Sequence, residues 1–148
     1  IHERNIPTDK LAEMIKKKNY PVITYYGDPA GTFVQGQSGM GDIHIFRKHG
    51  IYVEYRMDKL SRNIQGGISY CRGFFENADG LRRIKVDNRC VGIAEDFENY
   101  RFPEAVEGKA ISENPIKDGY NEHGCDAFRY FILNRFPIRS NFIGRISR

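Results

Sequence analysis

Residues 22–31, VITYYGDPAG, are the stretch of sequence that decides the fold. The first half of the stretch is β-branched or aromatic, which predicts a buried β-strand. The second half consists of glycine, aspartate, proline and alanine, which end the strand in a tight turn. Asp28 therefore lies at the carboxyl end of a strand, where ligands and reacting groups gather in open α/β sheets. An Asp before a Pro is also a common turn opener, so a purely structural role for Asp28 stays open.

Helical and extended patterns alternate on both sides of this stretch. Such alternation predicts an α/β sheet built from right-handed crossovers. Helices are expected to begin at the capping residues Thr8, Ser38, Ser61, Asn88 and Asn121, and the second and third to end at Gly50 and near Gly80. The first helix should end at residue 18. Further strands are expected at 51–56 (IYVEYR) and 83–87 (RIKVD), with an extended loop at 101–119.

The composition is that of one ordinary folded domain. The chain has 148 residues, of which 40% are hydrophobic, enough for a single core. The sequence contains no run of about 18 apolar residues, which excludes a membrane-spanning helix. The three cysteines are far apart and odd in number, which favours buried, reduced thiols in a cytosolic protein.

The net charge of +4 is compatible with a polyanionic partner. Basic residues gather at the end of the chain, where residues 135–148 contain arginines and no acidic residue. We therefore divide the chain into a domain at 1–134 and a basic carboxyl-terminal tail at 135–148. The opening residues, IHERN, include no initiator Met and no signal-peptide pattern, so further residues are expected upstream.

A second group of candidate residues lies in the segment 121–132, NEHGCDAFRYFI. His123 and Asp126 are three residues apart and share one face of the expected helix. A histidine and a carboxylate on one face can bind a metal ion or transfer protons. The alternative is a partly exposed His beside an Asp that interacts with the helix dipole.

Three segments, in order and spacing, resemble the nuclease domain of phage large terminases over roughly residues 20–134. The first is GDPAG with a Ser-led helix and HGI at 49–51, and the second is IKVDNRC with the helix that carries Glu95, Asp96, Phe97 and Glu98 before NYRF. The third is NPIKDGYNEHGCDAFRYFI, which meets the family's His-x-x-Asp-Ala-x-x-Tyr signature at His123, Asp126, Ala127 and Tyr130.

The resemblance implies an RNase H-like fold, with a mixed sheet flanked by helices, and endonucleolytic cutting of double-stranded DNA concatemers during packaging. In this family a carboxylate triad holds two divalent ions, Mg²⁺ or Mn²⁺. Asp28 matches the second carboxylate, Asp126 matches the third, and His123 stands where some members use a histidine. We therefore expect the carboxylates of Asp28 and Asp126 to lie within about 8 Å of each other, close enough to share an ion.

The chain departs from the family's pattern at its front. The family's first catalytic Asp lies on a strand that would precede Ile1, so the first strand or strands are expected to be missing. The ATPase motor is missing too, because GQSGMGD at 36–42 lacks the Lys of a phosphate-binding loop. We expect cleavage by this chain alone to be weak or absent.

In the implied mechanism, two ions activate a water and stabilise the leaving 3′ oxygen. Lys117, Arg129, Arg135 and Arg139 are candidates for phosphate contacts, which would position duplex DNA without reading its sequence. Solvated surface cations are the alternative for each. The resemblance also implies the terminase small subunit and the portal protein as partners, and the cytoplasm of a bacterial host as the location.

Two other interpretations stay open. One is a different RNase H-like nuclease of the resolvase or integrase type, against which the His-x-x-Asp-Ala-x-x-Tyr signature and the HGI segment argue. The other is a non-catalytic DNA-binding or assembly module that keeps the fold without the chemistry. A divalent-ion titration of an Asp28 variant separates an enzyme from such a module.

Overall fold

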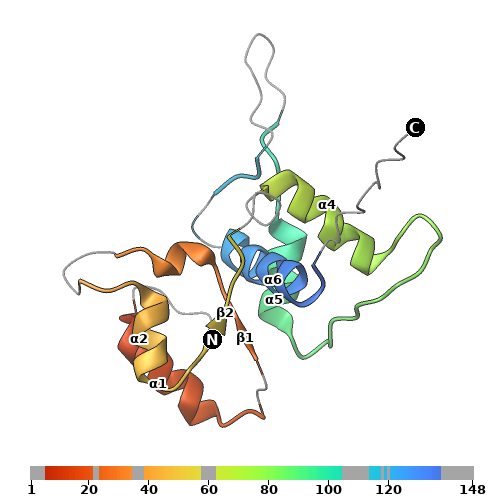
Figure 1. The fold of residues 1–148 in the computed structure, drawn as a ribbon. Helices are drawn as coiled ribbons and strands as arrows, with labels where there is room; N and C mark the ends of the chain where they lie inside the picture. The colour runs from red at the N-terminus through yellow and green to blue at the C-terminus, as the bar shows by residue number, and fades with distance from the viewer. Residues whose placement is uncertain are drawn as a thin grey trace, which may run out of the picture.

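The structure is a computed structural model of the chain, and it describes residues 6–21, 24–34, 39–57, 63–104, 114–117, 119 and 121–137. Within these ranges it contains both helices and strands, which confirms the α/β class (Figure 1). The elements are α1 (Thr8–Lys18), β1 (Tyr25–Tyr26), η1 (Pro29–Thr32), α2 (Asp42–Lys48), β2 (Val53–Glu54), α4 (Ile64–Phe75), α5 (Val91–Asn99) and α6 (Asn121–Arg135). Among the described residues, no helix has the length and apolar character that crossing a membrane requires.

The two strands form a parallel pair, as a strand–helix–strand crossover requires. Tyr25 lies opposite Val53, and α2 lies between the strands in the chain. The backbone N–H of Gly27 donates to the carbonyl of Glu54 at 3.0 Å, so the pairing continues one residue beyond β1. A side chain at position 27 would bring its Cβ within 2.7 Å of Val53 Cγ1, which explains the glycine.

Helix α1 packs against α2. The hydroxyl of Thr8 donates to the carboxylate of Asp42 at 2.6 Å, and Ala12 is fully buried. Thr8 was expected to be the N-cap of α1, but that position belongs to Pro7. The bond to Asp42 explains the difference, because a hydroxyl engaged by a second helix does not cap its own.

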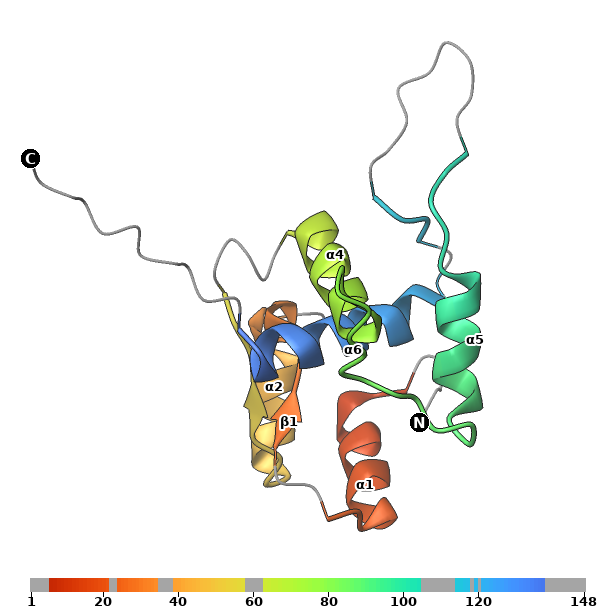
Figure 2. The same cartoon turned by 90° about the vertical axis from the view of Figure 1, so that its right-hand side faces the viewer.

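Helix α6 occupies the centre of the molecule, in contact with β1, α4 and α5 (Figures 1 and 2). Cys71 and Phe74 of α4 form the core with Ile132 of α6. The rings of Phe75, Phe97 and Phe128, one from each of α4, α5 and α6, lie 5.1–5.3 Å apart. The residues of α6 therefore bridge the strand pair and the helical part of the molecule.

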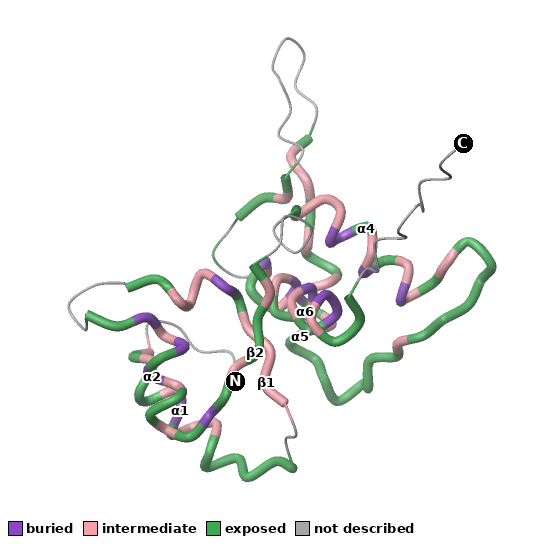
Figure 3. Tube along the Cα trace, in the orientation of Figure 1, coloured by how far each residue is buried: buried purple, intermediate pink, exposed green. Residues whose placement is uncertain are grey.

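The strand expected at 83–87 is not formed, and this prediction was wrong. The backbone N–H groups of Arg83 and Ile84 both donate to the carbonyl of Phe74, at 2.9 and 3.1 Å. The segment thus folds back on the end of α4, and most of its residues are exposed (Figure 3). The sheet of the described residues is a parallel pair, and the expected mixed sheet is not seen there.

The predicted helix boundaries were confirmed in part. Helix α6 begins at Asn121 as predicted, and Gly50, with φ of +75°, follows the end of α2. Asn63 caps α4 by accepting a bond from the N–H of Gly66 at 2.9 Å, and α4 ends well before Gly80. Asn88 was expected to cap α5, but α5 begins at Val91, after a turn closed by the bond from Cys90 N to Asp87 O. Ser38 and Ser61 lie outside the described residues.

Candidate active site

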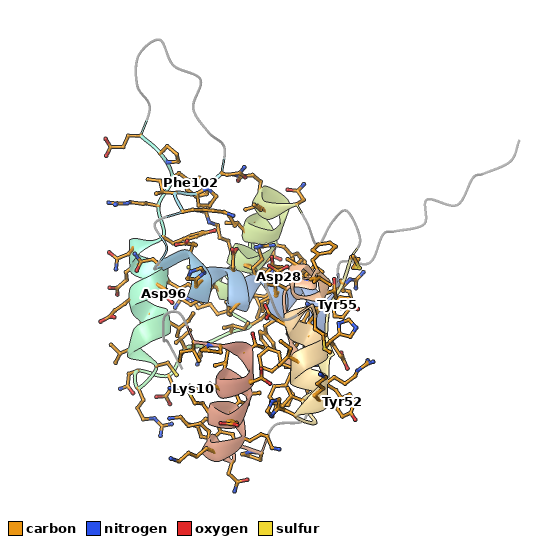
Figure 4. The ribbon with its side chains drawn as sticks, turned by 90° about the vertical axis from the view of Figure 1, so that its left-hand side faces the viewer. Lys10, Asp28, Tyr52, Tyr55, Asp96 and Phe102 are labelled. Carbon is orange, nitrogen blue, oxygen red and sulfur yellow. The ribbon has the colours of Figure 1, made fainter. Side chains whose placement is uncertain are left out.

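A cavity of about 240 Å³ lies between the turn after β1 and helix α6. It brings together Asp28 and Asp126, the two carboxylates that sequence reasoning singled out. Figure 4 shows Asp28 beside the ribbon of α6. The cavity is lined by Asp28, Pro29, Ala30, Phe33, Met57, Ile64, Lys117, Asp126, Arg129 and Tyr130. An approach of the Asp28 and Asp126 carboxylates to within about 8 Å remains a prediction, because a place in the same cavity lining does not fix the distance between them.

Asp28 is held at the end of β1 by local backbone geometry. It is the N-cap of η1, and its carboxylate accepts a bond from the N–H of Ala30 at 2.8 Å. Pro29 occupies the first helical position, where its fixed φ suits the turn. Tyr130 of α6 lines the same cavity. Asp28 is thus a turn opener and a cavity-lining carboxylate at once.

Asp126 is held by an arginine one turn further along α6. Nη2 and Nε of Arg129 lie 2.8 and 3.2 Å from Oδ1 of Asp126. The Asp126 side chain is 29% exposed, whereas that of Arg129 is only 5% exposed. Burial lowers the pKa of Arg129, but the bonds to Asp126 outweigh this effect and raise the pKa overall. Arg129 is therefore a permanent internal cation beside Asp126.

Tyr130 was matched from the sequence only as a letter of the family signature, and its place in the cavity lining was missed. Burial, reinforced by the nearby Asp28, raises the pKa of Tyr130, so its hydroxyl stays protonated. The four-residue spacing from Asp126 to Tyr130 was the available signal, because it places both side chains on one face of the helix.

His123 is exposed on α6 and does not line the cavity. The neighbouring Glu122 is buried, and its carboxylate accepts a bond from the N–H of Gly119 at 2.8 Å. In the part of the chain that the structure describes, no group of three or more His, Cys, Asp or Glu side chains is arranged to hold a metal ion. The structure therefore brings Asp28 and Asp126 to one cavity but leaves His123 outside it.

The four candidate phosphate contacts occupy different environments. Lys117 is exposed and lines the cavity with the carboxylates, and Arg129 lies inside the protein. Arg135 is exposed near the end of α6, with its guanidinium carbon 5.3 Å from the centre of the Phe136 ring. Arg139 lies outside the described residues. Among these four residues, Lys117 is both exposed and part of the cavity lining, so it is the one placed to contact a phosphate at the cavity.

The second segment of the family resemblance contributes a buried carboxylate away from the cavity. Asp96 of α5 is only 5% exposed and lies against Gly124 in the first turns of α6. Any Cβ at position 124 would overlap the Asp96 carboxylate. Asp96 does not line the cavity with Asp28, and its observed contact belongs to the packing of α5 on α6.

The donor set of the cavity fits one hydrated divalent ion. Asp28 is exposed and Asp126 is partly exposed, so both can offer hard oxygen atoms to an ion that enters from solvent. Mg²⁺ commonly keeps several waters and is bound through one or two carboxylates, which matches this pair. A second ion would need further carboxylates, which the described residues do not add here.

Comparison with protein-family models, with curated proteins and with solved structures found no match to this chain.

Proposed function

We propose that this chain is the nuclease portion of a phage large terminase, with an RNase H-like fold that uses Mg²⁺ or Mn²⁺ to cut double-stranded DNA. One observation carries the proposal: Asp28 and Asp126, assigned to the site from separate segments of the sequence, line the same cavity. The order and spacing of three family-like segments support it independently. Concatemeric DNA, the terminase small subunit and the portal protein are the proposed partners, in the cytoplasm of a bacterial host.

Each lining residue has a distinct task in this proposal. Asp28 and Asp126 would hold the divalent ion, which supplies an activated water and stabilises the leaving oxygen. Lys117, at the exposed side of the cavity, would bind a DNA phosphate and orient the strand. Arg129 orients the Asp126 carboxylate through its two nitrogen contacts. Arg135 and Arg139 are further proposed phosphate contacts, and Arg139 lies outside the described residues.

The decisive experiment measures Mn²⁺ binding, because cutting by this chain alone is expected to be weak. The free aquo-ion signal in electron paramagnetic resonance gives the dissociation constant for the 148-residue chain and its variants. Asp28→Asn and Asp126→Asn should each weaken Mn²⁺ binding by at least about ten-fold, since each removes one charged ligand. Asp79→Asn is the matched control, because Asp79 is exposed in a turn and does not line the cavity.

A plasmid-nicking assay with Mn²⁺ then separates the classes of function. Nicking that Asp28→Asn abolishes and Asp79→Asn preserves supports a nuclease. The chain would instead be a DNA-binding or assembly module if it bound DNA in a salt-sensitive way but showed no ion binding or nicking that depends on Asp28. Unchanged Mn²⁺ affinity in both Asp28→Asn and Asp126→Asn would refute the proposed site.

A further inference from the structure

Two adjoining hollows on the face of α4 form a groove that carries positive charge. Their volumes are about 490 and 500 Å³, and Tyr70, Phe74 and Arg83 line both of them. Arg135 and Phe136, at the end of α6, line the second hollow. None of the described residues that line the two hollows is acidic. We call the surface formed by these five residues the arginine groove.

The two arginines of the groove differ from their neighbours in how their charge is compensated. Arg83 and Arg135 are both exposed, and within the described part of the chain neither takes part in an ion pair. In contrast, the guanidinium of Arg82 lies 2.7 Å from the carboxylate of Glu76. The charges of Arg83 and Arg135 are therefore available to an anionic ligand. We propose that the arginine groove binds the phosphate backbone of duplex DNA.

Each guanidinium of the groove lies over an aromatic ring. The guanidinium carbon of Arg83 is 5.6 Å from the centre of the Phe74 ring, and that of Arg135 is 5.3 Å from the centre of the Phe136 ring. Such cation–π contacts hold the plane of a guanidinium and leave its N–H edge open. The open edge can bind two oxygens of one phosphate, which makes arginine the preferred residue for this ligand.

The backbone segments that carry the two arginines are both tied to α4. The N–H of Arg83 donates to the carbonyl of Phe74 at 2.9 Å. The hydroxyl of Tyr70 donates to the carbonyl of Phe136 at 3.0 Å, next to Arg135. Two segments about 50 residues apart in the chain are thus held at one helix, so the groove is formed before a ligand binds.

The rings of the groove favour a duplex over a single strand. Proteins that bind single strands stack the bases on open aromatic faces. In the groove, Phe74 is only 5% exposed, and Phe136 packs against it at 5.1 Å between ring centres and carries Arg135. The groove therefore offers guanidinium edges rather than stacking surfaces, which suits a duplex whose phosphates lie outside and whose bases lie inside.

The inference goes beyond the proposed function, because the groove shares no lining residue with the cavity of Asp28 and Asp126. DNA binding at the groove needs neither a divalent ion nor either carboxylate. It should therefore persist in EDTA and in Asp28→Asn. Loss of DNA binding in EDTA would overturn the groove as the binding surface.

Three matched variants, Arg83→Gln, Arg135→Gln and Arg82→Gln, test the groove by fluorescence anisotropy with a labelled duplex in EDTA. Each removes one charge and keeps a long polar side chain. Arg83→Gln and Arg135→Gln should each weaken binding by about five-fold at low salt and lower the slope of log Kd against log salt by about one, because each loses one phosphate contact. Arg82→Gln should leave the slope unchanged, since Arg82 is paired with Glu76 and does not line the groove. Equal losses in Arg82→Gln and Arg83→Gln would overturn the inference.

Competition against the bound duplex identifies the ligand class. Unlabelled duplex should displace the probe better than a single strand of the same length or polyglutamate at equal total charge. Better displacement by the single strand would overturn the assignment to a duplex, and equal displacement by polyglutamate would overturn the assignment to nucleic acid. Binding that depends on Arg83 and Arg135 in a chain without Mn²⁺ affinity would retain the groove and refute only the proposed nuclease.

Discussion

Two cavities of similar volume lie on either side of Arg129, and their linings differ in kind. The cavity with Asp28 and Asp126 measures about 240 Å³, and a second, between α4, α5 and α6, measures about 280 Å³. Arg129 lines both. The second cavity is lined by Ile68, Cys71, Arg72, Phe75, Phe97, Tyr100, Cys125, Phe128 and Arg129. The two cavities therefore differ in the chemistry of their linings rather than in their volumes.

The apolar cavity suppresses ionisation. Burial raises the pKa of the Cys71 thiol to about 11, an effect that the nearby Arg129 charge partly opposes. Burial, reinforced by the negative charges of Asp96, Asp126 and Glu122, raises the pKa of the Cys125 thiol to about 12. The thiols of this cavity behave as small apolar groups, as expected of buried cysteines, whereas Cys90, which was also expected to be buried, is exposed.

The largest expected effect is on the free energy of unfolding, when one phenylalanine from each cavity is replaced by alanine. Phe128→Ala should lower the free energy of unfolding by about 2 to 3 kcal/mol, because this ring packs against Phe75 and Phe97. Phe33→Ala, at the cavity with the carboxylates, should change it by no more than about 0.5 kcal/mol, since Phe33 is 60% exposed. Urea unfolding of both variants measures the contrast. Equal losses would show that both cavities belong to the stabilising core.

A smaller effect is expected at the contact between α5 and α6. Gly124→Ala should cost about 2 kcal/mol of stability, because the added methyl group forces the Asp96 carboxylate and the first turns of α6 apart. Gly73→Ala on α4 is the control, since a Cβ there meets no atom within 4 Å. It should stabilise the protein by up to about 1 kcal/mol through helix propensity. Tolerance of Gly124→Ala would mean that α5 and α6 pack less closely than described.

The smallest effect concerns the thiols and pH. At pH 8, a disulfide reagent should modify the exposed Cys90 at least about ten-fold faster than Cys71 or Cys125, because the buried thiols do not form thiolates there. Mass spectrometry of labelled peptides assigns the sites, and Cys90→Ser should remove the fast phase. Rapid labelling of Cys71 at pH 8 would show that the apolar cavity opens to water.

The buried thiols of Cys71 and Cys125 also determine the direction in which stability changes with pH. A raised pKa in the folded state means that the fold favours the protonated thiol. The stabilisation is complete below the ordinary pKa of 9.0 and is lost as the pH rises toward about 11 for Cys71 and about 12 for Cys125. Urea midpoints measured from pH 8 upward should therefore fall above pH 9, and less so in Cys71→Ala.

Local patterns predicted the parts of the fold that depend on neighbouring residues. The strand at Tyr25–Tyr26, the helix Thr8–Lys18 and the start of α6 at Asn121 follow from periodicity, capping residues and turn formers. The expected strand at 83–87 failed because a strand needs a partner. The partner that its N–H groups found was the carbonyl of Phe74, which no local pattern reveals.

The site shows the same division between local and distant information. Asp28 and Asp126 were identified from the sequence because each stands at a recognisable position in its own segment. The bond from Arg129 to Asp126, and the meeting of both carboxylates at one cavity, required the packing of α6 against Gly67 and against the turn after β1. His123 was placed with Asp126 by spacing alone, and a three-residue step leaves enough rotation around the helix to turn one side chain outward.

The cavity shared by Asp28 and Asp126 also has a consequence for folding. It brings together residues about 100 positions apart in the chain, so its formation carries a large loop-closure cost and follows the local elements in time. The strand–helix–strand unit and the helical unit can each form from contacts nearer in sequence, and the carboxylate pair assembles only when α6 docks on β1. In hydrogen exchange, opening of that junction would dissolve the site while the helices stay protected, so binding competence and helical content are separate equilibria.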